Sequence, residues 1–287
     1  MLKTVWLTEQ PNMENGSAML LGGFDGLHVG HKLLVERAKA SGLPVGIMTI
    51  VGGKENQSLF TFSEREEIFK NNGIDFVFEL PFLEIKNLTP QEFCELLLKE
   101  FSPKLFVCGE DFRFGANACG TSESLKGRGQ VRVECLPLVE LDGEKVSSRT
   151  IKKYVAAGDV ERAAKLLGMP FCITGSVVKD RQVGRTMGFP TANIFYPQEK
   201  CPLKKGVYET RVRVDDRVYK GITNYGARPT FAENTVITET YLDGFDGDLY
   251  GRTLQVEFIR YLREIKKFDN ATELKKQLEE DIGRIRK

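Results

Sequence analysis

The two histidines of this chain lie three residues apart in the glycine-rich segment 22–31, which reads GGFDGLHVGH. The apolar run 18–21 before it predicts a buried strand, and the pattern from residue 33 onward predicts a helix. His28 and His31 therefore lie at a helix start, where free backbone amides and the helix dipole favour anions. The segment predicts a site that binds phosphate and stabilises negative charge developing on it during a reaction.

Two other interpretations of the histidine pair stay open: incidental surface residues, and one half of a metal site. A zinc site needs a third ligand and usually a fourth. The sequence has no further histidine, and its six cysteines show no CxxC spacing. Because the strand, glycine and helix signals agree around the pair, the phosphate site is the favoured interpretation.

Two further segments of the first half place polar side chains where a nucleotide could bind. Residues 109–115, GEDFRFG, follow a predicted strand, so Asp111 and Phe112 could meet a base or a flavin ring. A plain core position would explain Phe112 equally well. The later segment KVSSRT opens a predicted helix with Ser147 and Ser148. These hydroxyls predict either a second phosphate clamp or an ordinary helix cap.

The second half carries a different set of polar residues. Glycines and cations between residues 175 and 188 could wrap a polyphosphate in backbone amides. The Thr191 hydroxyl and the Asn193 amide oxygen are hard donors that suit Mg²⁺. Glu239 lies in an alternating strand; if odd positions face a barrel interior, it is a candidate general base, and otherwise a solvated strand residue. The residues expected to surround phosphate here are Gly175, Gly184, Arg185 and Gly188.

Composition restricts the class of protein. The 287 residues suffice for two domains, and the net charge of +1 gives no electrostatic case for nucleic-acid binding. There is no apolar run of about 18 residues to span a membrane and no export signal at the N-terminus. The irregularly spaced cysteines indicate reduced thiols. We therefore expect a cytoplasmic protein with small-molecule substrates and no membrane partner, while its oligomeric state is left open.

The sequence pattern changes near residue 165. Before it, apolar runs alternate with helical patterns, which predicts a parallel sheet covered by helices on both faces. One expected helix begins at Ser63, with Glu66 completing a capping box. The strands are expected at 45–50, 76–80 and 104–108, and the helices at 63–71, 90–101, 148–155 and 160–167.

Beyond Pro170 the apolar period becomes two residues. This alternation predicts a small closed antiparallel β-barrel, and an apolar stripe at helical spacing predicts a helix after it. We therefore expect one domain over residues 1–165 and a second over 166–287. The barrel strands are expected in a hairpin over 207–222 and at 236–242 and 253–261, and the terminal helix at 271–285.

Together these motifs resemble those of the prokaryotic bifunctional riboflavin kinases and FAD synthetases over essentially the whole chain. Residues 23–31 resemble the nucleotidylyltransferase signature HxGH, and 109–115 resemble the flavin-side loop of that enzyme. Residues 188–193, 226–231 and 247–251 are similar to the kinase signatures. The resemblance implies a Rossmann-like nucleotidylyltransferase domain, followed by a riboflavin kinase barrel with a C-terminal helix.

The resemblance also implies the reactions and the residues that perform them. The first domain would transfer AMP from ATP to FMN, giving FAD and pyrophosphate, and the second would phosphorylate riboflavin, with Mg²⁺ bound to the ATP. The implied roles are catalysis for Glu239, His28 and His31; ATP or phosphate binding for Gly23, Phe24, Asp25, Gly30, Ser147, Ser148, Gly175, Gly184, Arg185, Gly188, Thr191 and Asn193; flavin binding for Asp111, Phe112 and Arg228; and metal binding for Thr191 and Asn193.

The chain departs from the family pattern at Arg149, where threonine is usual, and at Lys152, where arginine is usual. Lysine keeps the charge but loses the bidentate geometry of arginine. A riboflavin kinase with a weak or inactive adenylyltransferase domain is therefore the nearest alternative. Two others are a nucleotidylyltransferase for a different phosphorylated substrate and a flavin-binding regulator without catalysis.

Overall fold

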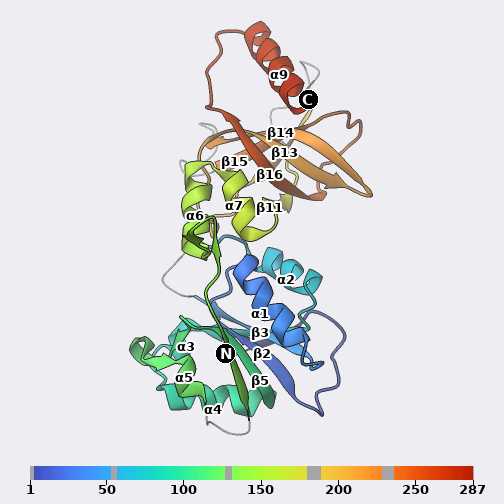
Figure 1. Ribbon diagram of the computed structural model, residues 1–287. Coiled ribbons are helices and arrows are strands. Elements are labelled where there is room, and N and C mark those ends of the chain that lie inside the picture. Colours follow the sequence, from blue (N-terminus) through green and yellow to red (C-terminus); the bar gives the residue numbers. More distant parts are fainter. Residues whose placement is uncertain (1–2, 53–56, 127–130, 180–188, 228–235, 287) are drawn as a thin grey trace. The chain divides into compact units, whose positions relative to one another are not determined.

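The computed structural model describes residues 3–52, 57–126, 131–179, 189–227 and 236–286 (Figure 1). The chain divides into two compact units, Met1–Thr150 and Ile151–Lys287. The domain boundary expected after residue 165 falls inside helix α7 (Val160–Leu167) and stays a prediction. No disulfide joins any of the six cysteines, all of which are among the described residues. In the described part of the chain, no helix has the length and apolar character needed to cross a bilayer.

The first unit is built on a six-stranded sheet of order β1-β4-β3-β2-β5-β8. Every pairing is parallel except that of β1 with β4, so the predicted parallel sheet is confirmed. The edge strand β1 was not predicted from the sequence. The strands are β1 (Lys3–Trp6), β2 (Ser17–Leu21), β3 (Val45–Val51), β4 (Phe76–Pro81), β5 (Pro103–Gly109) and β8 (Arg132–Leu136).

Helices cover both faces of this sheet. Figure 1 shows α1 (Val29–Lys39) and α2 (Phe62–Asn71) on one face, and α3 (Phe82–Ile85), α4 (Pro90–Phe101) and α5 (Ser122–Leu125) on the other. The face under α4 holds a large core, because this helix buries one apolar stripe against alternate residues of the strands. That core includes Met19, Met48, Phe76, Phe78, Phe93, Leu97, Phe101 and Phe106.

The start of α2 corrects one expectation. The capping box is formed by Thr61 and Glu64, not by Ser63 and Glu66. The Thr61 Oγ1 accepts a hydrogen bond from the Glu64 N–H at 3.3 Å, and the Glu64 carboxylate accepts one from the Thr61 N–H at 2.8 Å. Both pairs fit the same sequence pattern. The tertiary fold selects the pair that it buries, since Glu64 is only 2% exposed.

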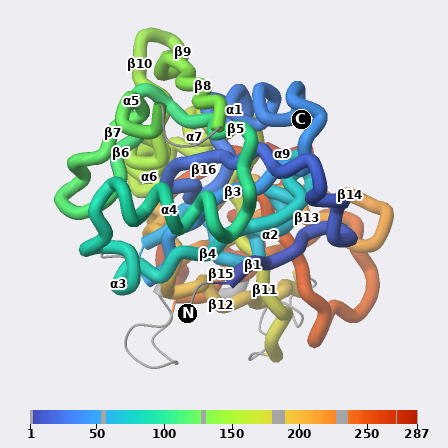
Figure 2. The backbone as a smooth tube through the Cα atoms, turned by 90° about the horizontal axis from the view of Figure 1, so that it is seen from below, coloured from blue at the N-terminus to red at the C-terminus, as the bar shows by residue number. Residues whose placement is uncertain are grey.

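Short elements link β5 to the second unit. After β5 come β6 (Arg113–Phe114), the 3₁₀ turn η1 (Ala116–Ala118) and β7 (Gly120–Thr121). After β8, the hairpin of β9 (Glu140–Leu141) and β10 (Glu144–Lys145) leads into α6 (Ser148–Ala157). The path from β8 through this hairpin can be followed in Figure 2.

The second unit contains a six-stranded antiparallel sheet of order β11-β16-β13-β14-β15-β12. A bridge between Val178 and Asn193 joins the segment after β11 to β12, so the two edges of the sheet meet. This arrangement confirms the small antiparallel barrel. The strands are β11 (Phe171–Ser176), β12 (Thr191–Phe195), β13 (Gly206–Val214), β14 (Arg217–Ala227), β15 (Val236–Leu242) and β16 (Thr253–Arg263).

A row of buried threonines crosses the barrel interior. The hydroxyl oxygens of Thr210 and Thr223 lie 2.9 Å apart, and those of Thr223 and Thr240 also lie 2.9 Å apart. All three residues are fully buried, so each hydroxyl is satisfied by its neighbour on the next strand. The row identifies the even positions of β15 as the inward-facing ones.

The terminal helix α9 (Ala271–Arg286) packs against the outside of this sheet. Its Ile282 and Ile285 join a core cluster with Val207 and Ile222. A buried ion pair holds it there, because the Arg263 guanidinium donates to both carboxylate oxygens of Asp281 at 2.7 to 3.2 Å. An ion pair between Arg286 and Asp243 at 2.7 Å adds a second link.

We expect Asp281→Ala to lower the free energy of unfolding of the second unit by about 3–5 kcal/mol, because it leaves the Arg263 charge buried without its partner. All eight tyrosines lie in the second unit, so urea denaturation followed by tyrosine fluorescence measures this loss. Arg286→Ala is the matched control on the same helix, and because its ion pair is exposed to solvent the expected loss is much smaller. Equal losses in the two variants would contradict the expectation.

Candidate active sites

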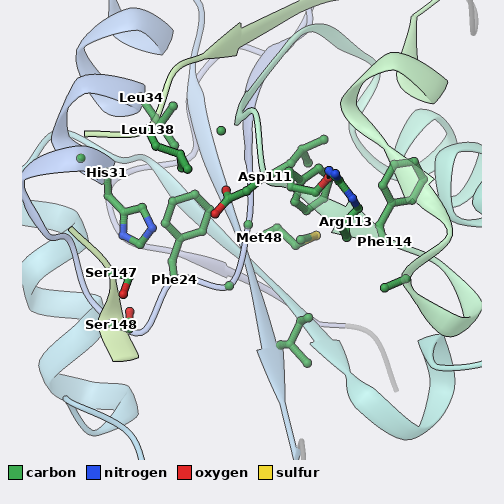
Figure 3. Close-up of a pocket in the computed structure, with 18 of the residues that line it drawn as sticks. Phe24, His31, Leu34, Met48, Asp111, Arg113, Phe114, Leu138, Ser147 and Ser148 are labelled. Carbon is green, nitrogen blue, oxygen red and sulfur yellow. Dashed lines mark hydrogen bonds between the residues drawn. The ribbon is translucent and has the colours of Figure 1, made fainter. Parts of the chain in front are cut away.

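A cavity of about 790 Å³ opens in the first unit at the carboxyl ends of its parallel strands. This edge is where open α/β sheets bind ligands. Figure 3 shows His31, Ser147 and Ser148 gathered at one end of the cavity and Arg113 and Phe114 at the other. The cavity therefore has a polar end and an aromatic end. Its lining includes the sequence-predicted residues Gly23, Phe24, His28, Gly30, His31, Asp111, Phe112, Ser147 and Ser148.

The histidine pair is held by hydrogen bonds to the backbone. His28 is the N-cap of α1, and its Nδ1 accepts from the His31 N–H at 3.1 Å. The His31 Nδ1–H donates to the Gly26 carbonyl oxygen at 3.0 Å. The two rings stack with centroids 3.5 Å apart. Since the Nδ1 of His28 is an acceptor, the proton of its neutral ring lies on Nε2, which can donate to a ligand.

Burial determines the charge state of both rings. Desolvation lowers the pKa of His28 to about 4. Desolvation also lowers the pKa of His31 well below its usual value, and the neighbouring His28 lowers it further. Both imidazoles are therefore neutral at pH 7 in the ligand-free protein. A bound polyphosphate brings negative charge that favours the protonated form, so the pair can gain positive charge as it binds.

The lowered pKa values predict acid sensitivity of the first unit. Between pH 6.5 and pH 5 the unfolded chain binds protons on these histidines and the folded chain does not, so stability falls as pH falls. The slope is at most about 1.4 kcal/mol per pH unit for each histidine. Fluorescence of Trp6, the single tryptophan, reports on this unit in urea denaturation. The variant His28→Asn should show a smaller slope, and an unchanged slope would contradict the assignment.

Steric contacts favour glycine at two positions of the histidine segment. A Cβ at Gly30 would lie 3.3 Å from the His28 ring and 3.5 Å from the Cβ of Val139, so a side chain there would press on the imidazole. Gly26 has a φ of +112°, and a Cβ there would lie 2.6 Å from the ring of Phe60. Both positions keep the segment close to its neighbours and His28 facing the cavity.

Asp25 makes a contact that the sequence did not predict. Both of its carboxylate oxygens accept from the Leu59 N–H at 3.0 Å, which ties the histidine loop to the segment before α2. Among the described residues that line the cavity, Asp25 is not present. This contact holds the loop in place, and phosphate binding by Asp25 stays a prediction; the neighbouring Gly23 and Phe24 line the cavity.

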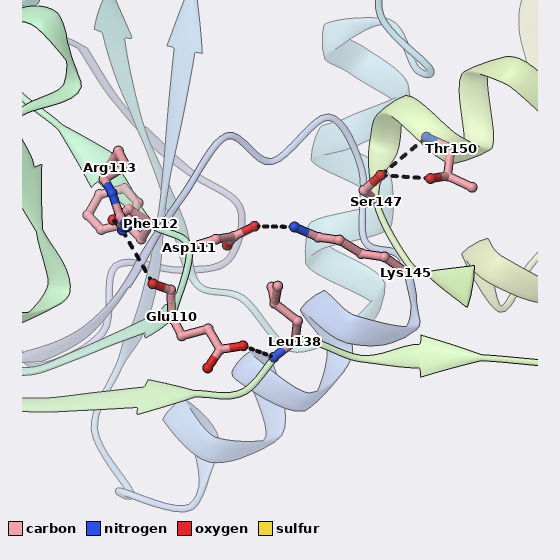
Figure 4. A network of polar contacts seen from close by, with 8 residues as sticks. All are labelled: Glu110, Asp111, Phe112, Arg113, Leu138, Lys145, Ser147 and Thr150. Atoms are coloured by element: carbon pink, nitrogen blue, oxygen red, sulfur yellow. Dashed lines mark hydrogen bonds and ion pairs between the residues drawn. The ribbon is translucent and has the colours of Figure 1, made fainter. Parts of the chain in front are cut away.

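The loop after β5 and the β10 strand meet across the cavity in an ion pair, drawn in Figure 4. The Lys145 Nζ lies 2.8 Å from the Asp111 Oδ2, and each side chain is about half exposed. Phe112 is buried, stacks on Phe114 with centroids 5.4 Å apart, and lines the cavity. Phe112 therefore belongs both to the core and to the cavity wall, and its contact with a base or flavin ring stays a prediction. Lys145 was not among the expected site residues.

Ser147 caps a helix and also lines the cavity. Its Oγ accepts from the Thr150 N–H at 3.2 Å, which caps the start of α6. The same hydroxyl faces the cavity beside Ser148 (Figure 3). A helix cap and a phosphate clamp are compatible here. The Thr150 N–H uses one lone pair of the Ser147 hydroxyl, and the contact with the Thr150 Oγ1 at 3.0 Å uses either the proton or the second lone pair, so one hydrogen-bonding position is left for a ligand.

A second polar cluster lies on the barrel. The Thr191 Oγ1 donates to the Glu239 Oε1 at 3.0 Å, and Asn193 is the direct register partner of Glu239 across β12 and β15. The expected interior position of Glu239 is wrong. Thr238 and Thr240 face the interior and are fully buried, so Glu239 and Tyr241 face outward, toward the cavity bordered by α9.

Two cavities meet at Thr191. One, of about 550 Å³, is lined by Thr191, Asn193 and the turn 245–250. The other, of about 280 Å³, is lined by Thr191, Glu239 and residues of α9. Two ligands could therefore lie on either side of one hydroxyl, an arrangement that suits transfer of a group between them.

Asn193 is suited to hold a cation. It is 5% exposed, and its Oδ1 is buried with no hydrogen-bond partner among the described residues. Because the Thr191 proton is directed at Glu239, the lone pairs of that hydroxyl remain available beside this amide oxygen. Two hard oxygen donors fit Mg²⁺ bound together with phosphate and water.

The remaining expected residues of the second unit are less informative. A Cβ at Gly175 would lie 2.5 Å from the Cγ2 of Ile194, so this glycine allows close packing of β11 against β12, and it lines neither cavity. Asn224, which lines the cavity beside Glu239, was missed because no local motif marks it. Gly184, Arg185, Gly188 and Arg228 lie outside the described residues.

Comparison with known proteins matches both units. A family model described as FAD synthetase matches residues 10–150, and one described as riboflavin kinase matches residues 167–287. The bifunctional riboflavin kinase/FMN adenylyltransferase of Pseudomonas fluorescens is 32% identical over 94% of this chain and 92% of its own. That of Escherichia coli K12 is 32% identical over 93% and 91%.

One solved structure and one longer relative also match this chain. A crystal structure named as a macrolide-efflux protein from Streptococcus pneumoniae matches with a TM-score of 0.86 and 31% identity over 94% of both chains. The trifunctional protein RibF/MnmA of Mycoplasmoides gallisepticum is 32% identical, and this chain spans 42% of its length.

The chain has an α/β nucleotide-binding unit followed by an antiparallel barrel, and each unit has its own polar cavity. Together with the two family matches, this places it in the class of two-domain enzymes of ATP-dependent group transfer. Both matching families use ATP, generally with a divalent metal. The chain belongs to the family of bifunctional riboflavin kinase/FMN adenylyltransferases.

Proposed function

We propose that residues 166–287 transfer the γ-phosphoryl group of ATP to riboflavin, giving FMN, and that residues 1–165 transfer AMP from a second ATP to FMN, giving FAD and pyrophosphate. The observation that supports this division is that each unit has its own polar cluster at its own cavity. The histidine pair belongs to the first unit, and the Thr191–Glu239 pair belongs to the second.

In the adenylyltransferase unit we assign the polar end of the cavity to ATP. The Nε2–H of His28, the ring of His31 and the amides at the start of α1 bind the phosphates and stabilise the charge that develops on the α-phosphate. Ser147 and Ser148 bind the departing pyrophosphate. The aromatic end, with Phe112 beside Asp111, holds the flavin of FMN, whose phosphate attacks ATP without a protein nucleophile.

In the kinase unit we assign Glu239 as the general base. Its carboxylate accepts the proton of the terminal ribityl hydroxyl, and the hydrogen bond from Thr191 fixes the carboxylate toward the smaller cavity. Thr191 and Asn193 are the residues that would hold the Mg²⁺ brought in with ATP. When bound, this ion neutralises charge on the phosphates during transfer.

Incubation of the protein with riboflavin, ATP and Mg²⁺, followed by chromatographic separation of the flavins, tests the proposal. We expect FMN to appear first and FAD to follow. FMN without FAD would favour a kinase with an inactive adenylyltransferase unit, the consequence that the departures Arg149 and Lys152 allow. Flavin binding without consumption of ATP would instead favour the non-catalytic regulator.

A further inference from the structure

Asn224 lies next to Glu239, the proposed general base, on the neighbouring strand. It lies on β14, where the register makes it the direct partner of Glu239 on β15. Asn193 is the partner of Glu239 on the opposite side, across β12. The three side chains therefore form one row on the outer face of the barrel, in the order Asn193, Glu239, Asn224.

The amide of Asn224 has an unmet hydrogen bond. Its Oδ1 is buried and has no hydrogen-bond partner among the described residues. Leaving a buried acceptor unsatisfied is unfavourable, and native proteins rarely keep such groups without a partner. Because Asn224 lines the 280 Å³ cavity with Glu239, a ligand in that cavity can supply the missing donor.

The walls of this cavity indicate which ligand that is. Thr191, Asn224 and Glu239 place their polar groups on the sheet side. Most of the remaining wall is apolar: Phe189, Val207, Ile222, Ile265, Phe268, Leu274 and Leu278. A molecule with a polyhydroxyl chain and an apolar ring system matches this division, whereas a wholly polar acceptor does not.

We propose that Asn224 binds the ribityl hydroxyl next to the one that is phosphorylated, and so selects a polyhydroxyl acceptor and directs its terminal hydroxyl to Glu239. This proposal rests on the riboflavin kinase activity proposed above. Phosphate is expected on the Asn193 side of Glu239, so the rest of the acceptor must extend past Asn224. Cross-strand partners have Cβ atoms roughly 4.5–5.5 Å apart, which lets Asn224 and Glu239 reach neighbouring hydroxyls of one chain.

The test compares two acceptors in the full-length protein. One is riboflavin, and the other is an analogue that lacks the ribityl hydroxyl next to the terminal one. We expect the unmodified protein to prefer riboflavin about tenfold or more in kcat/KM, the equivalent of one hydrogen bond. In Asn224→Ala this preference should disappear, while the KM for ATP and FAD formation from supplied FMN stay unchanged.

A second variant separates this function from a structural one. Asn224→Leu keeps the size of the side chain and removes its polar atoms, so it should also lose the acceptor preference while remaining folded. If either folded variant keeps the preference, or if the unmodified protein shows none, the assignment of Asn224 is wrong. Absence of FMN formation by the unmodified protein would instead contradict the kinase activity itself, so the two failures are distinguishable.

Discussion

Replacement of His28 by alanine is expected to abolish FAD formation from FMN and to leave FMN formation from riboflavin unchanged. His28 faces the cavity of the first unit, and its Nε2–H is the donor that we assign to the phosphates of ATP. Loss of one such donor at a developing charge lowers kcat by about 10²–10³-fold. The same preparation supplies the internal control, since the kinase cavity lies in the other unit.

A second substitution separates chemistry from folding at this position. His28 is also the N-cap of α1, so alanine removes a helix cap together with the imidazole. His28→Asn keeps a good capping side chain and still removes the ring. We expect His28→Asn to fold with native-like stability at pH 7 and to lose FAD formation as alanine does. If the asparagine variant retained FAD synthesis, the effect of alanine would be one of folding.

Replacement of Glu239 by glutamine is expected to reduce FMN formation from riboflavin strongly and to leave FAD formation from FMN unchanged. Glutamine keeps a carbonyl oxygen that can accept the Thr191 hydrogen bond, so the local geometry is preserved. It cannot take a proton from the acceptor hydroxyl, and loss of a general base lowers kcat by about 10²–10⁴-fold. Chromatography of the flavins should then show little FMN from riboflavin and normal FAD from supplied FMN.

The matched control for this variant is Glu257→Gln. Glu257 also lies on a barrel strand, but its carboxylate pairs with Arg211 at 3.3 Å on the surface and lines neither kinase cavity. We expect this change to leave both activities unaltered. Equal loss of kinase activity in the two variants would show that any loss of a strand carboxylate is harmful, and Glu239 would no longer stand out as the base.

Local sequence pattern predicted most of the fold because the apolar periods are strong in both units. Strand β15 and helix α7 agree with the predicted ranges, and α4 begins at its proline as expected. Strand β1 was missed because its four residues are partly or fully exposed and show no apolar alternation. An edge strand of this kind depends on its pairing with β4, which lies far along the chain.

The two sites differ in how far the sequence could predict them. The histidine pair lies within one segment, so glycine, strand and helix signals coincide there. The orientation of β15 was not accessible, because α9 borders its outer face and Ile237 is as buried as an interior residue. Asn224 was missed because its place beside Glu239 is set by strand pairing and not by local sequence, and the contact of Asp25 with Leu59 is a tertiary one as well.

The position of α9 has a consequence for how the kinase unit holds its substrate. Leu274 and Leu278 of this helix form part of the wall of the smaller cavity, while Asp281 ties the same helix to the sheet. Occupancy of the cavity and docking of the helix are thus linked equilibria, and a ligand that requires the docked helix stabilises it by mass action. By the same linkage, contacts that dock α9 raise the affinity of the cavity for its ligand. Arg286 is such a contact, although it does not line the cavity.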